Sequence, residues 1–142
     1  MIHPTYSKYT NERRAIAEKG DILITCKGAG LGKLNIANTR IAISRQLMAI
    51  GAIGINSTYL KITLDSMYDY FQSKGVGIAI PGISREDVLE PTIMLPPVQE
   101  QINIIDQFMM INNILDCLKE KIKSAKQTQL HLADALTDAA IN

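Results

Sequence analysis

Residues 98–140 contain neither glycine nor proline, and this uninterrupted stretch constrains the fold more than any other feature of the sequence. Apolar residues recur along it with alternating spacings of four and three, as in coiled-coil heptads. Ten of the eleven seam positions between 104 and 139 are apolar, and Gln129 is the exception. The eight largest are Ile104, Phe108, Ile111, Leu115, Leu118, Ile122, Leu132 and Leu136. This spacing predicts one long helix with a continuous apolar seam.

The predicted helix needs a partner along its seam. At 1.5 Å per residue it would run about 60 Å, which a small neighbouring domain cannot cover. Long helices draw most of their stability from packing an apolar face against another element. Pro96-Pro97 suits the first turn of a helix and ends whatever precedes it. We therefore expect residues 96–142 to form a helical domain whose seam is a dimerisation surface.

Several short runs in residues 1–95 predict strands. Residues 21–26 are rich in β-branched and apolar side chains and indicate a buried strand that ends at a glycine-rich loop. Four further strands are expected at residues 41–43, 46–50, 78–80 and 92–95.

Helical signals lie between these runs. Asn56 or Ser57 can cap a helix whose apolar face includes Leu60, Leu64, Met67 and Phe71, and which ends at Gly75. Residues 84–87 have the arrangement of a capping box, and residues 11–17 are expected to include one helical turn. The predicted fold class is α+β, with a small mixed α/β domain at residues 1–95 followed by one long helix.

Charge is distributed unevenly along the chain, although the net charge is only +1. Residues 1–46 carry eight Lys or Arg and three acids, a balance of +5, whereas residues 98–142 carry four Lys and six acids, a balance of −2. A basic segment favours contact with a polyanion, although from charge alone a solvated surface is the simpler explanation.

Five side chains of this basic segment are of types that bind DNA: Lys27, Lys33, Arg40, Arg45 and Gln46. Lysine suits phosphate, arginine can bind guanine through two hydrogen bonds, and glutamine can bind adenine in the same way. We expect Lys27 and Lys33 to contact phosphate and the other three to contact phosphate or base edges. For Arg45 a structural role, bonding buried carbonyls, is an equally good explanation.

The loop with Gly28, Gly30, Gly32 and Lys33 does not match a nucleotide-binding motif. Its spacing fits neither the GxxxxGK nor the GxGxxG template. A flexible turn that lets the backbone approach another group closely, such as a DNA phosphate, explains the glycines better.

The sequence contains no set of residues that predicts catalysis or a cofactor. Asp65 and Asp69 have the i, i+4 spacing of a metal pair, but solvated charge explains them better. Cys26 and Cys117 lack the spacing of a metal site and are expected to be reduced. No apolar run reaches the roughly 18 residues of a membrane span. We expect no metal, no membrane insertion and a cytoplasmic location.

Five segments, taken in order, resemble the DNA specificity subunit of type I restriction-modification systems. Residues 20–25, the glycine loop 28–32, and residues 43–50 are followed by the Ile-Pro-Gly-Ile-Ser segment at 80–84. The fifth is Leu95-Pro-Pro-Val-Gln-Glu-Gln101, which leads into the long helix. Each segment is weak alone, but the order and the final motif are specific, and the resemblance covers about residues 17–140.

The resemblance implies a function without catalysis. Subunits of this family usually hold two target-recognition domains, each reading half of a split DNA sequence. Their two conserved helices pack antiparallel, set the spacing between the half-sites and dock the modification subunits. Methylation and ATP-dependent cleavage belong to other subunits. The expected partners are therefore double-stranded DNA, modification (methyltransferase) subunits, and a second copy paired as an antiparallel homodimer.

The chain departs from the family pattern in two respects. It carries one recognition region and one helix, and the family's domain usually contributes further strands before the segment at 20–25. A sheet without those strands would expose an edge. The alternative interpretation is a coiled-coil assembly or regulatory module whose truncated head does not bind DNA specifically.

Overall fold

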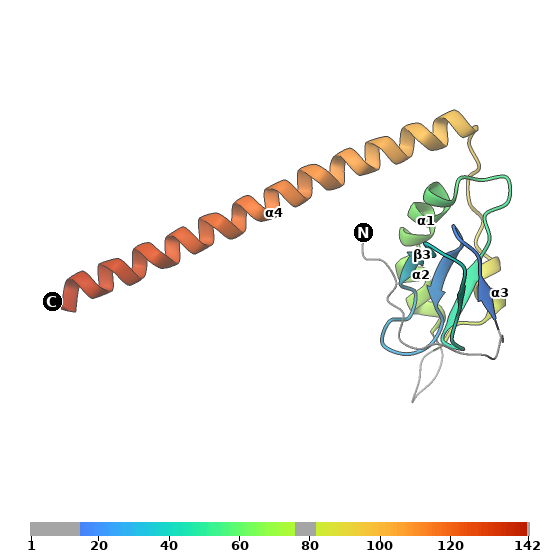
Figure 1. Cartoon of the computed structure of the whole chain (residues 1–142), viewed down its shortest axis with the longest axis horizontal. Coiled ribbons are helices and arrows are strands. Elements are labelled where there is room, and N and C mark those ends of the chain that lie inside the picture. Colours follow the sequence, from blue (N-terminus) through green and yellow to red (C-terminus); the bar gives the residue numbers. More distant parts are fainter. Residues whose placement is uncertain (1–14, 76–81, 142) are drawn as a thin grey trace. The chain divides into compact units, whose positions relative to one another are not determined.

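The computed structural model describes residues 15–75 and 82–141. The chain divides into two compact units, Met1–Ile102 and Asn103–Asn142. In its described residues, the first unit contains five short strands, three short helices and the beginning of the long helix α4, and the described part of the second is the rest of α4 (Figure 1). The predicted α+β class, a small mixed head followed by one long helix, is confirmed.

An antiparallel sheet of three strands lies at the centre of the first unit, in the order β3-β2-β5. Its strands are β2 (Ile22–Thr25), β3 (Leu34–Ile36) and β5 (Leu47–Ile50). A separate ribbon pairs β1 (Ile16–Ala17) with β4 (Ile41–Ala42). The strand predicted at residues 21–26 is thus the central strand of the sheet, β2.

The two faces of β2 are both buried, against different layers. Because side chains alternate along a strand, Ile22 and Ile24 face one way and Leu23 the other. Ile22 and Ile24 belong to the main core, with residues of α1 (Ser57–Asp65) and α2 (Tyr68–Lys74). Leu23 packs with residues of the β1–β4 ribbon and its neighbours in a second, smaller core. The sheet is therefore covered by helices on one face and by the ribbon on the other.

The helix predicted around Leu60 to Phe71 is in fact two helices, and that part of the prediction is wrong. Asn56 caps α1 as expected, its side chain accepting hydrogen bonds from the backbone of Thr58 and Tyr59. The helix stops at Ser66, whose hydroxyl bonds to the Thr63 carbonyl at 2.7 Å. Serine and threonine hydroxyls compete in this way with the backbone ladder.

Other local predictions had mixed outcomes. The capping box at Ser84 is present and starts α3 (Arg85–Leu89). Residues 16–17 form β1 rather than part of a helical turn, and β3 was not predicted. The run at 78–80 lies outside the described residues.

The strand predicted at residues 92–95 is wrong, because these residues have no regular structure. Prolines at 91, 96 and 97 remove ladder donors around it. A side chain bonds one carbonyl of this segment instead, because the Tyr59 hydroxyl donates to Met94 O at 3.1 Å.

Helix α4 (Val98–Ile141) begins after Pro96-Pro97, and its first turn is anchored by Gln101. This side chain is 1% exposed. Its Oε1 accepts from the Asn56 backbone N–H at 2.8 Å, and its Nε2 donates to Pro96 O at 2.8 Å. Gln101 thus connects the last residue before α1 with the start of α4, and the compact first unit continues through Ile102, past the prolines.

We predict that Gln101→Met destabilises the protein by about 2 kcal/mol, because a side chain of similar size would leave two polar backbone groups without partners. Gln107→Met is the matched control, since Gln107 lies exposed on the same helix. Urea unfolding of both variants measures the difference. Equal unfolding free energies would show that the two hydrogen bonds contribute nothing net.

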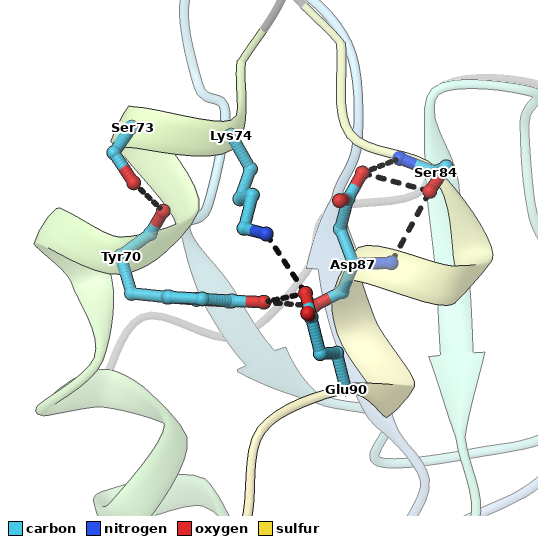
Figure 2. Close-up of polar contacts among 6 residues, drawn as sticks. All are labelled: Tyr70, Ser73, Lys74, Ser84, Asp87 and Glu90. Atoms are coloured by element: carbon cyan, nitrogen blue, oxygen red, sulfur yellow. Dashed lines mark hydrogen bonds and ion pairs between the residues drawn. The ribbon is translucent and has the colours of Figure 1, made fainter.

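Helices α2 and α3 are tied together by a polar cluster around Glu90 (Figure 2). Its Oε2 accepts from the Tyr70 hydroxyl and from Lys74 Nζ, each at 2.8 Å. The Lys74 ammonium and the Tyr70 hydroxyl lower the pKa of Glu90. Within the Ser84 capping box, the bonds from the Ser84 N–H and hydroxyl lower the pKa of Asp87. Both carboxylates are therefore stabilised in their charged form by the folded state.

This cluster should make the stability of the fold depend on pH. A carboxyl group whose pKa is lowered on folding stabilises the fold above its usual pKa, and that contribution is lost as pH falls through the folded pKa. We therefore predict that Glu90→Gln unfolds more easily than the wild type near neutral pH and that the difference shrinks as the pH falls from the usual glutamate pKa of about 4.5 through the lower pKa of the folded state. Thermal melts between pH 7 and 3 test this. A difference independent of pH would argue against the ionic contribution.

Candidate nucleic-acid interface and helical seam

Two turns meet at one end of the central sheet. The chain leaves β2 at Cys26, whose N–H donates to the Gln46 carbonyl at 2.7 Å, so the 27–33 loop and the 44–46 turn lie together. The Ile83 N–H donates to the Cys26 carbonyl at 3.0 Å, and Lys27 forms a β-bridge with Gly82. The segments singled out at 28–32, 43–50 and 80–84 thus converge, through their described residues, on one end of the sheet.

Four of the five proposed DNA-binding side chains lie at this end: Lys27, Lys33, Arg45 and Gln46. All four are exposed. Among the residues that the structure describes, no acidic side chain forms an ion pair with Lys27, Lys33 or Arg45. We call this group the turn cluster. Three cations without acidic partners give this end of the head a positive potential that favours anions.

Arg40, the fifth proposed DNA-binding residue, lies away from the turn cluster. It follows β3, near the opposite end of the sheet, where Gly20 N–H bonds the Ala37 carbonyl at 2.8 Å. Its Nε forms an ion pair with Glu18 Oε1 at 3.0 Å. The structure therefore separates Arg40 from the turn cluster and neutralises part of its charge.

The glycine loop is packed rather than free. Leu31 is buried in the main core, and its carbonyl accepts from Gln72 Nε2 at 2.6 Å. Gly32 has a φ of +76°, and a Cβ there would lie 3.1 Å from the Cβ of Phe71. The close approach at Gly32 is thus to helix α2, not to an external ligand. Gly28, with a φ of +90°, has open space around it and remains available for such an approach.

Two other sequence candidates have structural explanations. Asp65 pairs with Lys61 on α1, whereas Asp69 lies on α2, so the two carboxylates do not share one helix as their i, i+4 spacing suggested. Cys26 is buried, and this burial raises the pKa of its thiol, which disfavours the reactive thiolate. Within the described part of the chain, no three His, Cys, Asp or Glu side chains could together hold a metal ion.

The seam residues lie on α4 with their side chains largely uncovered. Phe108 is 41% exposed, Leu118 51% and Leu136 72%. Large apolar side chains at regular helical spacing are rarely left exposed to water, so we expect the seam to pack against a partner. Ile104 is half-buried. No described helix is long and apolar enough to cross a membrane.

A second apolar stripe lies beside the seam in the first half of α4. Met110, Ile114 and Cys117 line a shallow depression on the helix surface together with Leu118 of the seam. In the heptad Met110 and Cys117 occupy position c, outside a two-helix interface, whereas Ile114 occupies position g, at its edge. Met110 is 58% exposed and Ile114 59%. This half of α4 thus presents more apolar surface than one helical partner can cover.

The sequence matches one known protein family over most of its length. The sequence model of the family described as the type I restriction modification DNA specificity domain matches residues 2–127. The chain belongs to this family.

Curated relatives agree with this assignment. The specificity subunit of the type I restriction enzyme EcoEI from Escherichia coli is 35% identical over an alignment of 134 residues that covers 87% of this chain and 23% of that protein. The EcoAI specificity subunit, also from Escherichia coli, is 42% identical over 90 residues, 62% of this chain and 15% of that protein. The chain therefore spans about a quarter or less of these two relatives.

Solved structures show the same fold. The HsdS subunit from Thermoanaerobacter tengcongensis superposes with a TM-score of 0.72 at 26% identity, covering 84% of this chain and 28% of that one. The type I restriction-modification S subunit from M. genitalium matches with a TM-score of 0.56 at 18% identity, covering 73% of this chain and 29% of that one. The second match supports the fold alone.

Proposed function

We propose that this chain is a non-catalytic DNA sequence-specificity module of a type I restriction-modification complex. In this proposal it reads one half-site with its head and uses α4 to assemble with a second copy and with modification subunits. The observation that carries the proposal is the turn cluster, four exposed donor side chains gathered at one end of a family-typical head.

The turn cluster has the chemistry of a DNA contact. Lys27 and Lys33 flank the glycine loop and suit phosphate oxygens, whereas Arg45 and Gln46 on the neighbouring turn can reach base edges. A structural role for Arg45 finds no support, because none of the hydrogen bonds among the described residues involves its guanidinium. The backbone of Gln46 holds the turn, and its side chain is left exposed.

Modification subunits are the proposed occupants of the second stripe. A homodimer would use the seam with Ile114 at its edge, and Met110 and Cys117 would remain exposed beside it. Methionine-rich apolar surfaces adapt to partner helices because the side chain is flexible. The stripe therefore provides a separate contact next to the dimer interface.

We predict that the protein alone binds duplex DNA in the range of about 10⁻⁴ to 10⁻⁶ M. Lys27→Gln with Lys33→Gln should weaken binding equally on all sequences and lower the salt slope by about 1.8, the value for two lost phosphate contacts. Fluorescence anisotropy at several salt concentrations measures both effects.

The matched control is Lys19→Gln with Lys123→Gln, which removes the same charge from exposed positions outside the five proposed DNA-binding residues. It should leave the salt slope unchanged. If both double variants lose affinity equally, net charge rather than the turn cluster governs binding. If the wild type does not bind DNA even with a modification subunit, the chain acts as an assembly or regulatory module.

The helix pairing we propose is antiparallel. One register of the antiparallel pair brings together residues whose numbers sum to 240. Five different pairs then face each other across the seam: Phe108 with Leu132, Leu115 with Ala125, Ile122 with Leu118, Gln129 with Ile111, and Leu136 with Ile104. A register summing to 247 is an alternative of equal length. Lysines at 119, 121 and 126 gather near the midpoint, but Lys119 pairs with Asp116 on its own helix at 3.0 Å. Exposed repulsions of this kind cost only tenths of a kcal/mol per pair, less than a buried leucine contributes.

Spin labels distinguish the orientations. Asp106 and Glu120 both occupy the outer f position of the heptad. In an antiparallel pair, labels at Asp106 should lie at least about 40 Å apart along the axis, whereas labels at Glu120 should lie close together. Short distances at both positions would mean a parallel pair. The double variant Leu118→Asp, Ile122→Asp should abolish both signals, because it buries unpaired carboxylates in the seam.

A further inference from the structure

The segment of residues 82–85 lies at the end of the sheet that carries the turn cluster, but it has no part in the function proposed above. Ile83 N–H donates to the Cys26 carbonyl at 3.0 Å, and Gly82 forms a β-bridge with Lys27. A Cβ at Gly82 would lie 3.5 Å from Cγ of Lys27 and 3.9 Å from its Cε. The side chain of Lys27 therefore lies over Gly82, so the two segments share one surface.

Arg85 ends this segment and is the first residue of α3. It is exposed, and it lines a groove beside β5 together with Ile43 and Leu47. These two residues stand on either side of the turn that carries Arg45 and Gln46. Among the described residues, the Arg85 guanidinium has neither an ion pair nor a hydrogen bond. Arg85 is thus a further exposed cation beside the turn cluster.

Local folding does not explain an arginine at this position. The first turn of a helix exposes backbone N–H groups, whose partial positive charge favours acids and disfavours cations. Glu86 and Asp87 supply the acids, and Asp87 completes the capping box by accepting from the Ser84 N–H at 2.8 Å. Neither acid forms an ion pair with Arg85. A cation that its own helix disfavours, in a segment that packs beside Lys27, suits an external anion.

Arg85 and Lys33 lie on opposite sides of the turn cluster. Thr25 N–H donates to the Lys33 carbonyl at 3.0 Å, which places Lys33 on the β3 side of β2. The N–H and C=O of one residue in an extended strand point the same way, and Cys26 N–H points to the β5 side. Its carbonyl therefore holds Ile83, and with it Arg85, on that side. The proposed base-reading turn has a cation on each side.

We propose that Arg85 is a further DNA-binding residue, which contacts a backbone phosphate on the side of the turn cluster opposite Lys33. This inference rests on the proposed function, because it adds a residue to the same site. A guanidinium matches the geometry of a phosphate group through two parallel hydrogen bonds. Phosphate contacts fix the register and orientation of a protein on the duplex, whereas base contacts specify the sequence. Contacts on both sides of the turn would hold it against the base edges.

The salt dependence of DNA binding by the full chain tests the role of Arg85. Arg85→Gln should lower the salt slope by about 0.9, the value of one phosphate contact, and equally on unrelated duplex sequences. Arg85→Lys retains the charge and should retain the slope. Lys19→Gln is the matched control, because it removes one exposed charge near Gly20, at the other end of the sheet, and should leave the slope unchanged. The melting temperature of Arg85→Gln should equal or exceed that of the wild type, because a cation is removed from the start of α3.

The outcomes separate this inference from the proposed function. A wild type that does not bind DNA, with or without a modification subunit, would overturn both. A salt slope that falls in the Lys27→Gln, Lys33→Gln variant but not in Arg85→Gln would overturn this inference alone. An equal fall in Lys19→Gln, or a loss confined to one duplex sequence, would also overturn it. A lower melting temperature of Arg85→Gln would do the same, because Arg85 would then stabilise the fold.

Discussion

Burial of β2 on both faces is the constraint on which the head depends. Ile22, Leu23 and Ile24 are each at most 3% exposed, so neither face of this strand can be turned to water. Helices must cover one side and the β1–β4 ribbon the other. Once β2 is held in this way, the loop that follows it and the turn before β5 meet at one end of the sheet. The turn cluster is a consequence of that register rather than of any contact among its own side chains.

Where regular secondary structure ends, side-chain amides and hydroxyls form hydrogen bonds with the backbone groups. Tyr59 bonds the carbonyl of Met94, and Gln101 bonds Pro96 and Asn56, so the proline-rich connection before α4 is satisfied without a ladder. This explains a glutamine in the Pro-Pro-Val-Gln-Glu-Gln101 segment that the resemblance alone left unexplained. A carboxylate in its place could accept from Asn56 but could not donate to Pro96. The motif therefore serves as the attachment of the long helix to its head.

The sequence predicted what depends on local pattern. The central strand, the Asn56 cap, the Ser84 capping box and the start of α4 all follow from residue type and spacing, and all are confirmed. The sequence did not predict features that depend on a contact between residues far apart in the chain. Gln101 gave no signal because its partner Asn56 lies 45 residues away. The packing of Gly32 was missed because nothing local shows that Phe71 lies against it. The sequence also did not show that Arg40 lies away from Arg45, and whether Arg40 contacts DNA stays a prediction.

The proposed DNA contact and the stability of the fold depend on different atoms of the head, and this division has a consequence for the proposed specificity. The core side chains of β2, α1 and α2 are buried, whereas the turn cluster places only exposed side-chain ends at the tip of the sheet. Substitutions at exposed turn positions usually change stability by no more than about 0.5 kcal/mol. Arg45 or Gln46 can therefore change without loss of the fold, because Ser44 and the backbone of Gln46 hold the turn whatever side chains these two positions carry. In the proposed function, one scaffold can therefore read different DNA targets when the exposed side chains of the turn cluster are exchanged.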